Sequence, residues 1–222
     1  MITKLRSACT VRTIDISVSL HSRTPVWPGS PKFCLHWYKR LDAGDECNNS
    51  CLNCDTHVGT HVDAPSHFLE EAAAVEQLSL DVLIGPAIVA YLPEVSAITA
   101  SDLADLALPA DTERLLLHTR NSELWAAKIT EFREDYVALT SDAAEWIVQE
   151  GIRLVGVDYL SVGSYRDGVD THLILLQAGV VVIEGLNLYN VDAQEYELIC
   201  LPLKLVGAEG APARAVLIRR DL

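Results

Sequence analysis

THLILLQAGVVVIE, residues Thr171–Glu184, is the stretch that best indicates how this chain folds. Its first part, Thr171–Ala178, is predicted to be a short helix that stops at Gly179, since glycine commonly ends helices. Val180–Glu184 is then predicted to be a strand, and its unbroken run of apolar side chains indicates burial on both faces. A helix followed by a buried strand favours the α/β class.

Similar apolar runs extend from this stretch towards both ends of the chain. Further strands are predicted at Val11–Val18, Phe33–Tyr38, Ser50–His57, Pro86–Leu92, Arg114–Thr119, Ile152–Val157, Tyr196–Leu203 and Arg214–Arg219. Further helices are predicted at Ser101–Leu106, with Thr99 or Ser101 as a cap, and at Asp142–Glu150, which stops at Gly151. Because many strands follow one another directly, a regular doubly wound fold is disfavoured. No linker or repeat divides the chain, so we expect a single α/β domain over residues 1–222, with a mixed sheet and a few helices.

Charge and hydropathy exclude several classes of partner. The 222 residues carry 31 acidic and 17 basic side chains, a net charge of −14, and half of them are hydrophobic. Such a negative field repels nucleic acid and anionic membrane surfaces. The most apolar stretch, Leu173–Ile183, is well short of the ~20 residues that cross a bilayer. The N-terminus lacks a secretory signature, so we expect a cytoplasmic protein whose six cysteines are mostly reduced thiols.

The strongest functional signal is HVGTHVDAPSH, which places His57, His61, Asp63 and His67 within eleven residues. On a straight strand His57 and His61 would lie ~13 Å apart, too far for one metal ion. We therefore expect a strand that ends near Thr56, a bend at Gly59 and a loop that carries the ligands. Two imidazoles and one carboxylate leave a coordination position open for water, and this donor set suits Zn2+ or Mn2+.

A second pair of candidate ligands lies in the Thr171–Glu184 stretch. A helix that turns at Gly179 and returns as a strand brings the helix start and the strand end to the same edge, so His172 and Glu184 could meet. A charge at the end of a buried strand needs a partner or a cation. The alternative at this level is that both side chains are exposed to solvent.

Other polar and sulfur-containing residues have a weaker functional pattern. Cys47, Cys51 and Cys54 have a spacing known from iron–sulfur enzymes, but their position on a predicted strand favours simple thiols. His21, His36 and His118 are expected to be structural. Glu209 is expected at a solvated loop tip, with a position at the border of the pocket as the alternative.

Three motifs give the chain a resemblance to a known family. HVGTHVDAPSHF (His57–Phe68), LPLKLVGAEGAPARAVLI (Leu201–Ile218) and PVWPGSP (Pro25–Pro31) resemble the signatures of the cyclase family of metal-dependent hydrolases, which includes bacterial kynurenine formamidase and isatin hydrolase. The resemblance implies an α/β domain with a barrel-like mixed sheet of the swivelling β/β/α type, assembled as a homodimer or homotetramer.

The resemblance also implies roles for residues. His57, His61 and Asp63 would bind a first divalent ion, and Asp63 would bridge to a second held by His172 and Glu184. His67 would be the general acid and base, and Trp27 would lie against the substrate.

The implied function is hydrolysis of a small amide, formamide or lactam, such as an N-formylkynurenine-like compound, by metal-activated water. The segment Asp158–Asp170 departs from the usual formamidase loop, so the substrate is left open. An isatin-type cyclic amide hydrolase and a non-catalytic metal-binding protein with the same fold are the alternatives.

Overall fold

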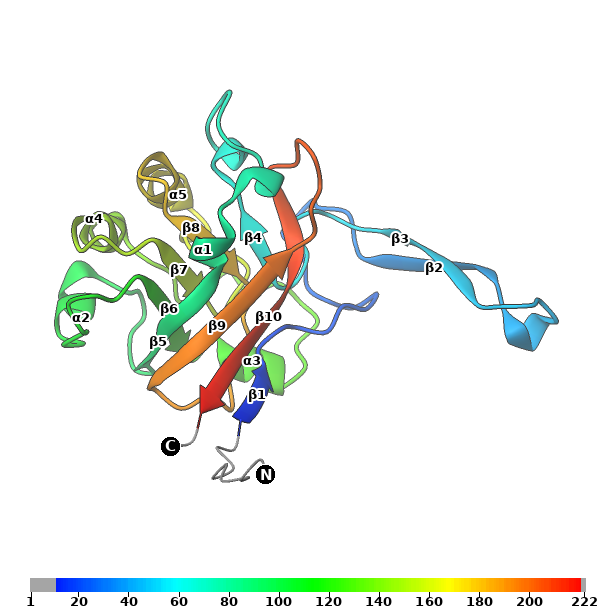
Figure 1. The fold of residues 1–222 in the computed structure, drawn as a ribbon, viewed down its shortest axis with the longest axis horizontal. Helices are drawn as coiled ribbons and strands as arrows, with labels where there is room; N and C mark the ends of the chain where they lie inside the picture. Colours follow the sequence, from blue (N-terminus) through cyan, green and yellow to red (C-terminus); the bar gives the residue numbers. More distant parts are fainter. Residues whose placement is uncertain (1–10, 221–222) are drawn as a thin grey trace, which may run out of the picture.

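The computed structural model describes residues 11–220, and its centre is a sheet of eight strands in the order β1-β10-β4-β8-β7-β6-β5-β9. Because β9 also pairs with β10, the seven strands other than β1 close into a ring. The α/β class and the mixed, barrel-like sheet are thereby confirmed (Figure 1).

One half of the ring is parallel. Its strands are β5 (Ile84–Leu92), β6 (Arg114–Thr119), β7 (Leu154–Val157) and β8 (Val181–Glu184). The helices α2 (Ala100–Ala104), α4 (Ser141–Gln149) and α5 (Gly168–Gln177) gather on one side of these strands (Figure 1). The strand β6 shows why its apolar run is unbroken, since Leu115 and Leu117 pack in the cluster beneath the helices while Leu116 packs in the cluster inside the ring.

The other half of the ring is antiparallel. It consists of β4 (His61–Asp63), β9 (Glu195–Pro202) and β10 (Gly210–Arg220), with β1 (Val11–Asp15) added outside the ring along β10. The long strand β10 therefore pairs with three strands: β1 at the start of the described residues, β4 in the histidine-rich segment, and β9.

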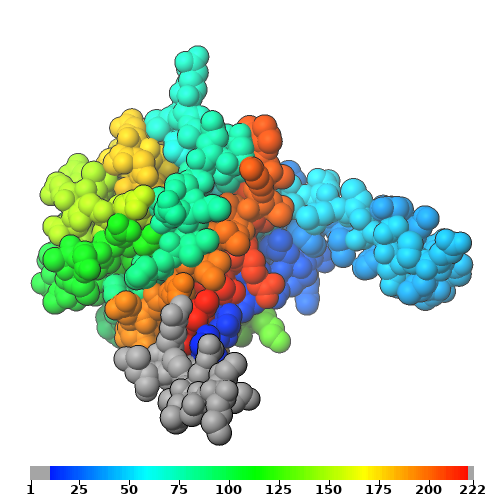
Figure 2. All heavy atoms as spheres, in the orientation of Figure 1, coloured from blue at the N-terminus to red at the C-terminus, as the bar shows by residue number. Residues whose placement is uncertain are grey.

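A two-stranded arm projects from this body. Its strands are β2 (Cys34–Lys39) and β3 (Asn49–Asn53), joined through the short 3-10 helix η1 (Leu41–Ala43). Among the described residues these two strands pair only with each other, and every residue of β2 is exposed. Figure 2 shows the arm standing clear of the rest of the molecule.

Most of the predicted elements are present, with shifted boundaries. The helix expected from Thr171 starts at Gly168, and the strand expected from Arg214 starts at Gly210. The strand expected to reach His57 ends at Asn53. The helices α1 (Leu80–Leu83) and α3 (Ser122–Ala126) and the 3-10 helices η2 (Pro65–His67) and η3 (Val75–Gln77) were not predicted, because each is only about one turn long.

The described residues include no helix that could span a membrane. Five cysteines lie among them, at positions 34, 47, 51, 54 and 200, and all are free thiols, as expected. Cys9 lies outside the described residues. Within residues 11–220, the groups that could hold a metal contain no cysteine, so the iron–sulfur interpretation has no support.

Candidate metal centre

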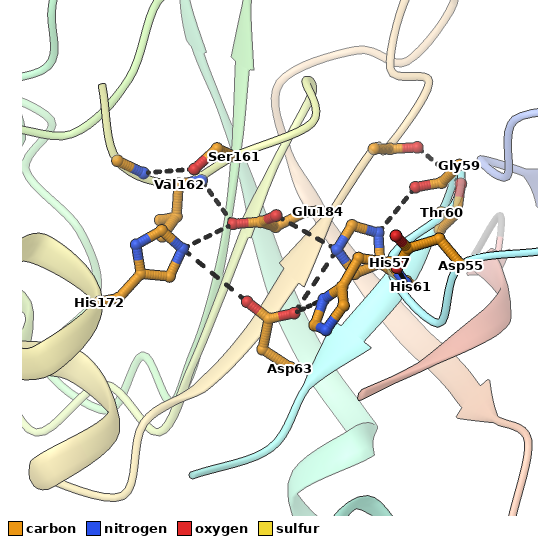
Figure 3. Close-up of polar contacts among 12 residues, drawn as sticks. Asp55, His57, Gly59, Thr60, His61, Asp63, Ser161, Val162, His172 and Glu184 are labelled. Atoms are coloured by element: carbon orange, nitrogen blue, oxygen red, sulfur yellow. Dashed lines mark hydrogen bonds and ion pairs between the residues drawn. The ribbon is translucent and has the colours of Figure 1, made fainter. Parts of the chain in front are cut away.

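The short strand β4 places two of the sequence-predicted ligands on the outer face of the ring, opposite to Val62, which packs in the cluster inside the ring. His61 and Asp63 are fully buried and lie two residues apart, so both point to the same face. The register of β4 against β8 pairs His61 directly with Glu184, and His61 Nε2 lies 3.2 Å from Glu184 Oε2 (Figure 3). The expectation that these residues lie on a loop was wrong, because hydrogen bonding to β8 and β10 extends this segment into a strand.

A turn before β4 brings in His57. Gly59 adopts a left-handed conformation with φ of 63°, which confirms the expected bend at this residue. The bend places the rings of His57 and His61 5.0 Å apart, and His57 Nδ1 lies 2.9 Å from Asp63 Oδ1. The chain thereby gathers groups that a straight strand would hold far apart.

His172 and Glu184 meet as the helix–strand return predicted. His172 lies on α5, and its Nδ1 donates to the Gly168 carbonyl oxygen over 2.7 Å. Its Nε2 consequently faces the carboxylates, 3.3 Å from Glu184 Oε1 and 3.9 Å from Asp63 Oδ2. Both side chains are buried, so the solvent-exposed alternative is excluded.

The electrostatics of the cluster are those of buried, paired groups. Burial lowers the pKa of His57, but the hydrogen bond and charge of Asp63 outweigh it and raise this pKa to about 9. Glu184 acts on His172 in the same way and raises its pKa to about 9 as well. Burial raises the pKa of Glu184, but the neighbouring imidazoles of His172 and His61 outweigh this and lower it well below its ordinary value.

The donor set fits a divalent cation. Two groups, His57–His61–Asp63 and Asp63–His172–Glu184, each have ligand atoms within 4.8 Å of one another, and Asp63 belongs to both. His61 Nε2 and Asp63 Oδ2 are buried and make no hydrogen bond. Burying a polar atom without a partner costs free energy, and a metal ion bound to these two atoms would remove that cost. Imidazole nitrogens and carboxylate oxygens are the ligands of zinc and related transition metals.

His67 lies beside this cluster without belonging to either group. Pro65 begins the 3-10 helix η2, whose last residue is His67, and the His67 ring stacks on His57 at 4.1 Å with 29° between the planes. Burial lowers the pKa of His67, and this outweighs the opposing field of Asp63. The side chain is therefore largely neutral at neutral pH, as a proton acceptor must be.

A cavity of about 430 Å³ opens onto these residues. His57, His67, His172 and Glu184 line its polar side, and Trp27, Phe68 and Leu160 line its apolar side. The Trp27 ring packs against the ring of Phe132, with centroids 5.1 Å apart, and against the ring of Tyr165, with centroids 5.3 Å apart.

Several residues of the site were missed by sequence reasoning. Glu209 was expected at a solvated loop tip, but it lines the cavity, as the alternative had it, and its Oε1 lies 3.4 Å from His57 Nε2. Phe132, Tyr165 and the Val162 amide, which donates to Glu184, come from loops with no local pattern to reveal them. His118 is buried against Tyr91, away from the cavity, in agreement with a structural role.

Comparison with protein families gives a match to the family described as "Putative cyclase" over residues 14–164. Among curated proteins, Cyclase-like protein 3 of Oryza sativa subsp. japonica is 40% identical over 216 residues, covering 94% of this chain and 80% of that protein. The kynurenine formamidase of Geobacillus thermodenitrificans (strain NG80-2) is 36% identical over 205 residues, covering 92% of this chain and 96% of its own.

Solved structures agree with the fold. A structure described as a potential metal-dependent hydrolase with cyclase activity superposes with a TM-score of 0.82 at 32% identity, covering 96% of this chain and all of that one. An isatin hydrolase bound to the product analogue thioisatinate has the same TM-score at 21% identity, over 95% of this chain and 93% of its own, which is a likeness of fold.

Proposed function

The chain belongs to the cyclase family, and from that premise we propose that it is a metal-dependent hydrolase of a small amide, formamide or lactam. The similar kynurenine formamidase and metal-dependent hydrolase support this reaction class. The observation that carries the proposal is the pair of imidazole–carboxylate groups that share Asp63, because His57, His172 and Glu184 of these groups line a cavity.

The proposed ligands are His57, His61 and Asp63 for one ion, with His172 and Glu184 completing a second site that Asp63 bridges. A bound Zn2+ or Mn2+ would supply Lewis acidity, which polarises a carbonyl group and makes water more acidic. Hydrogen bonds orient two of these donors. The His172 ring donates to the Gly168 carbonyl oxygen, and the Val162 amide donates to Glu184 Oε1 over 2.6 Å.

His67 is the proposed general acid and base. It lines the cavity next to the proposed ligands, and its lowered pKa leaves the ring neutral and able to accept a proton from the attacking water. The same nitrogen would then return that proton to the nitrogen atom of the leaving group. A purely metal-binding protein has no use for this neutral histidine, so its placement favours catalysis.

The apolar wall of the cavity supports an aromatic substrate. Trp27 and Phe68 offer flat faces for a ring, and a cavity of about 430 Å³ suits a compound of the N-formylkynurenine or isatin size. Trp27 is therefore the proposed substrate contact. Its replacement by alanine is expected to raise KM more than it lowers kcat.

The test begins with elemental analysis of the purified protein and continues with a substrate screen. We expect one or two equivalents of Zn2+ or Mn2+ per chain, and turnover of N-formylkynurenine, isatin or a simple cyclic amide. Hydrolysis of isatin without hydrolysis of formamides would identify the cyclic amide alternative. A fully loaded protein that hydrolyses none of them would favour a non-catalytic metal-binding role.

The arm supports assembly with a second copy of this chain, as a homodimer or homotetramer. Leu35, Trp37 and Leu52 are exposed on one face of the arm. A lone two-stranded hairpin is marginally stable in water. Residues 34–53 hold two basic and three acidic side chains, so this nearly neutral element can meet a second chain of charge −14 with little repulsion.

Light scattering during size-exclusion chromatography tests this assembly. We expect an oligomer that dissociates when Leu35 and Trp37 are both replaced by glutamate, and persists when His36 on the opposite face is replaced by glutamate instead. A monomeric wild-type protein, or an oligomer that survives the double replacement, contradicts the proposal.

The proposed compartment is the cytoplasm, and residues 1–222 are proposed to act as one hydrolase domain. The five free cysteines of the described part agree with a reducing compartment. Fractionation of the source cells, with the activity assayed in each fraction, tests the location.

A further inference from the structure

The C-terminal part of the chain contacts the candidate metal centre through Glu209. The Glu209 backbone carbonyl accepts a hydrogen bond from the Ala64 amide over 2.8 Å, just after β4. Its side chain accepts a hydrogen bond from Thr56 Oγ1 over 2.7 Å, just before His57. Glu209 is thus attached to both ends of the segment that carries His57, His61 and Asp63.

The ring of His57 is enclosed on three sides. Asp63 Oδ1 lies 2.9 Å from its Nδ1, and His67 stacks on its face. On the far edge, a Cβ added at Gly210 would lie 2.7 Å from His57 Cε1 and 3.1 Å from Nε2. Position 210 is therefore restricted to glycine so that the backbone after Glu209 can approach this ring.

The remaining nitrogen of His57 faces Glu209. His57 Nε2 is buried and makes no hydrogen bond, and Glu209 Oε1 lies 3.4 Å from it. An imidazole that offers Nδ1 to an ion carries its proton on Nε2, and a carboxylate that accepts this proton fixes the tautomer and the ring. The distance is slightly long for a hydrogen bond and is within reach of a small side-chain rotation.

We propose that Glu209 is a positioning residue for His57: its carboxylate accepts the Nε2 proton and holds Nδ1 free for the divalent ion. The inference rests on the metal centre of the proposed function. It pairs His57 of the histidine-rich motif with a carboxylate 152 positions later in the chain, a contact that sequence spacing could not predict.

The test compares metal affinity among matched variants. Glu209→Ala removes the acceptor, whereas Glu209→Gln keeps a neutral acceptor oxygen. Thr56→Val removes the bond between Thr56 and the carboxylate. Glu76→Gln is the control, because Glu76 accepts from the Gly207 amide of the same loop and does not touch His57.

Dissociation constants for Zn2+ and Mn2+ are measured by competition with a chromogenic chelator, and melting temperatures are measured without metal. We expect Glu209→Ala to bind metal about tenfold or more weakly, in the range seen when such outer partners are removed. Glu209→Gln should remain within about threefold of wild type, and Thr56→Val and Glu76→Gln should remain near wild type.

The tautomer gives a readout that a merely structural role would not move. In the zinc-loaded protein, the side-chain nitrogen NMR shifts of His57 should report a proton on Nε2, and Glu209→Ala should broaden or lose that signal. Unchanged metal affinity in Glu209→Ala would overturn the inference. Equal losses in Glu209→Ala and Glu209→Gln would also overturn it, since they would point to the negative charge alone. A wild-type protein that binds no metal would instead refute the proposed function.

Discussion

Replacing Gly185 by alanine should damage the protein more than any ordinary glycine substitution. Gly185 follows Glu184 at the end of β8 and has φ of 68°. A Cβ at this position would overlap the carbonyl oxygen of Gly59 and lie 2.7 Å from its carbon, whereas carbon atoms normally pack at about 3.5 to 4.0 Å. Both partners are backbone, so neither can rotate away.

The expected loss in the free energy of unfolding combines a conformational cost, strained hydrogen bonds and overpacking. The left-handed conformation costs alanine about 1 to 2 kcal/mol. Separating the two segments strains the hydrogen bonds from Gly185 N to the Tyr159 carbonyl and from Thr60 Oγ1 to the Gly185 carbonyl, both 2.6 Å long, at about 1 kcal/mol each. Overpacking adds about 1 to 3 kcal/mol. We therefore expect a total of about 4 to 7 kcal/mol, a large part of a typical stability of about 5 to 15 kcal/mol.

Gly179→Ala is the matched control. Gly179 has φ of 77°, and a Cβ added there would meet no atom within 4 Å, so its substitution carries the conformational cost without the overlap. Urea unfolding of the two variants measures the difference, and elemental analysis shows whether Glu184 still contributes to metal binding. If Gly185→Ala unfolds with the same free energy as Gly179→Ala, the close approach of these two backbone segments is not what restricts position 185.

Three further predictions concern the metal centre. His61→Ala should lose most of its bound metal, which elemental analysis measures, and a fully loaded variant would remove His61 from the ligand set. His67→Ala should keep its metal and lose about 10²–10⁴-fold in kcat, and steady-state kinetics with near-normal kcat would contradict its proposed role. In the metal-free protein, the pKa values of His57 and His172, raised from 6.5 to about 9, contribute stability that is complete below pH 6.5 and is lost as the pH rises through about 9. Because the ion must displace these protons, metal affinity should strengthen as the pH rises to about 9. Melting temperatures measured across this pH range, with and without a chelator, report both trends. If the melting temperatures with and without the chelator change with pH in the same way, the prediction is contradicted.

The sequence alone determined the class of the fold and the core of the candidate site. Apolar runs such as Arg114–Thr119 mark buried strands without any knowledge of their neighbours, and β6 has those same bounds. The spacing of His57, His61 and Asp63 likewise required a bend at Gly59, because ligand distances allow no straight path between the two imidazoles. These features are local, so local chemistry is enough to predict them.

Only the tertiary structure decided how distant segments complete the centre. The register of β4 against β8 sets Glu184 opposite His61, and the pairing of β4 with β10 brings Glu209 and Gly210 to His57. The β4 segment is a strand because two partners supply its hydrogen bonds, although its sequence predicted a loop. Strand register and long-range pairing arise from closing the ring, whose contacts join residues more than a hundred positions apart, and no single stretch of sequence encodes them.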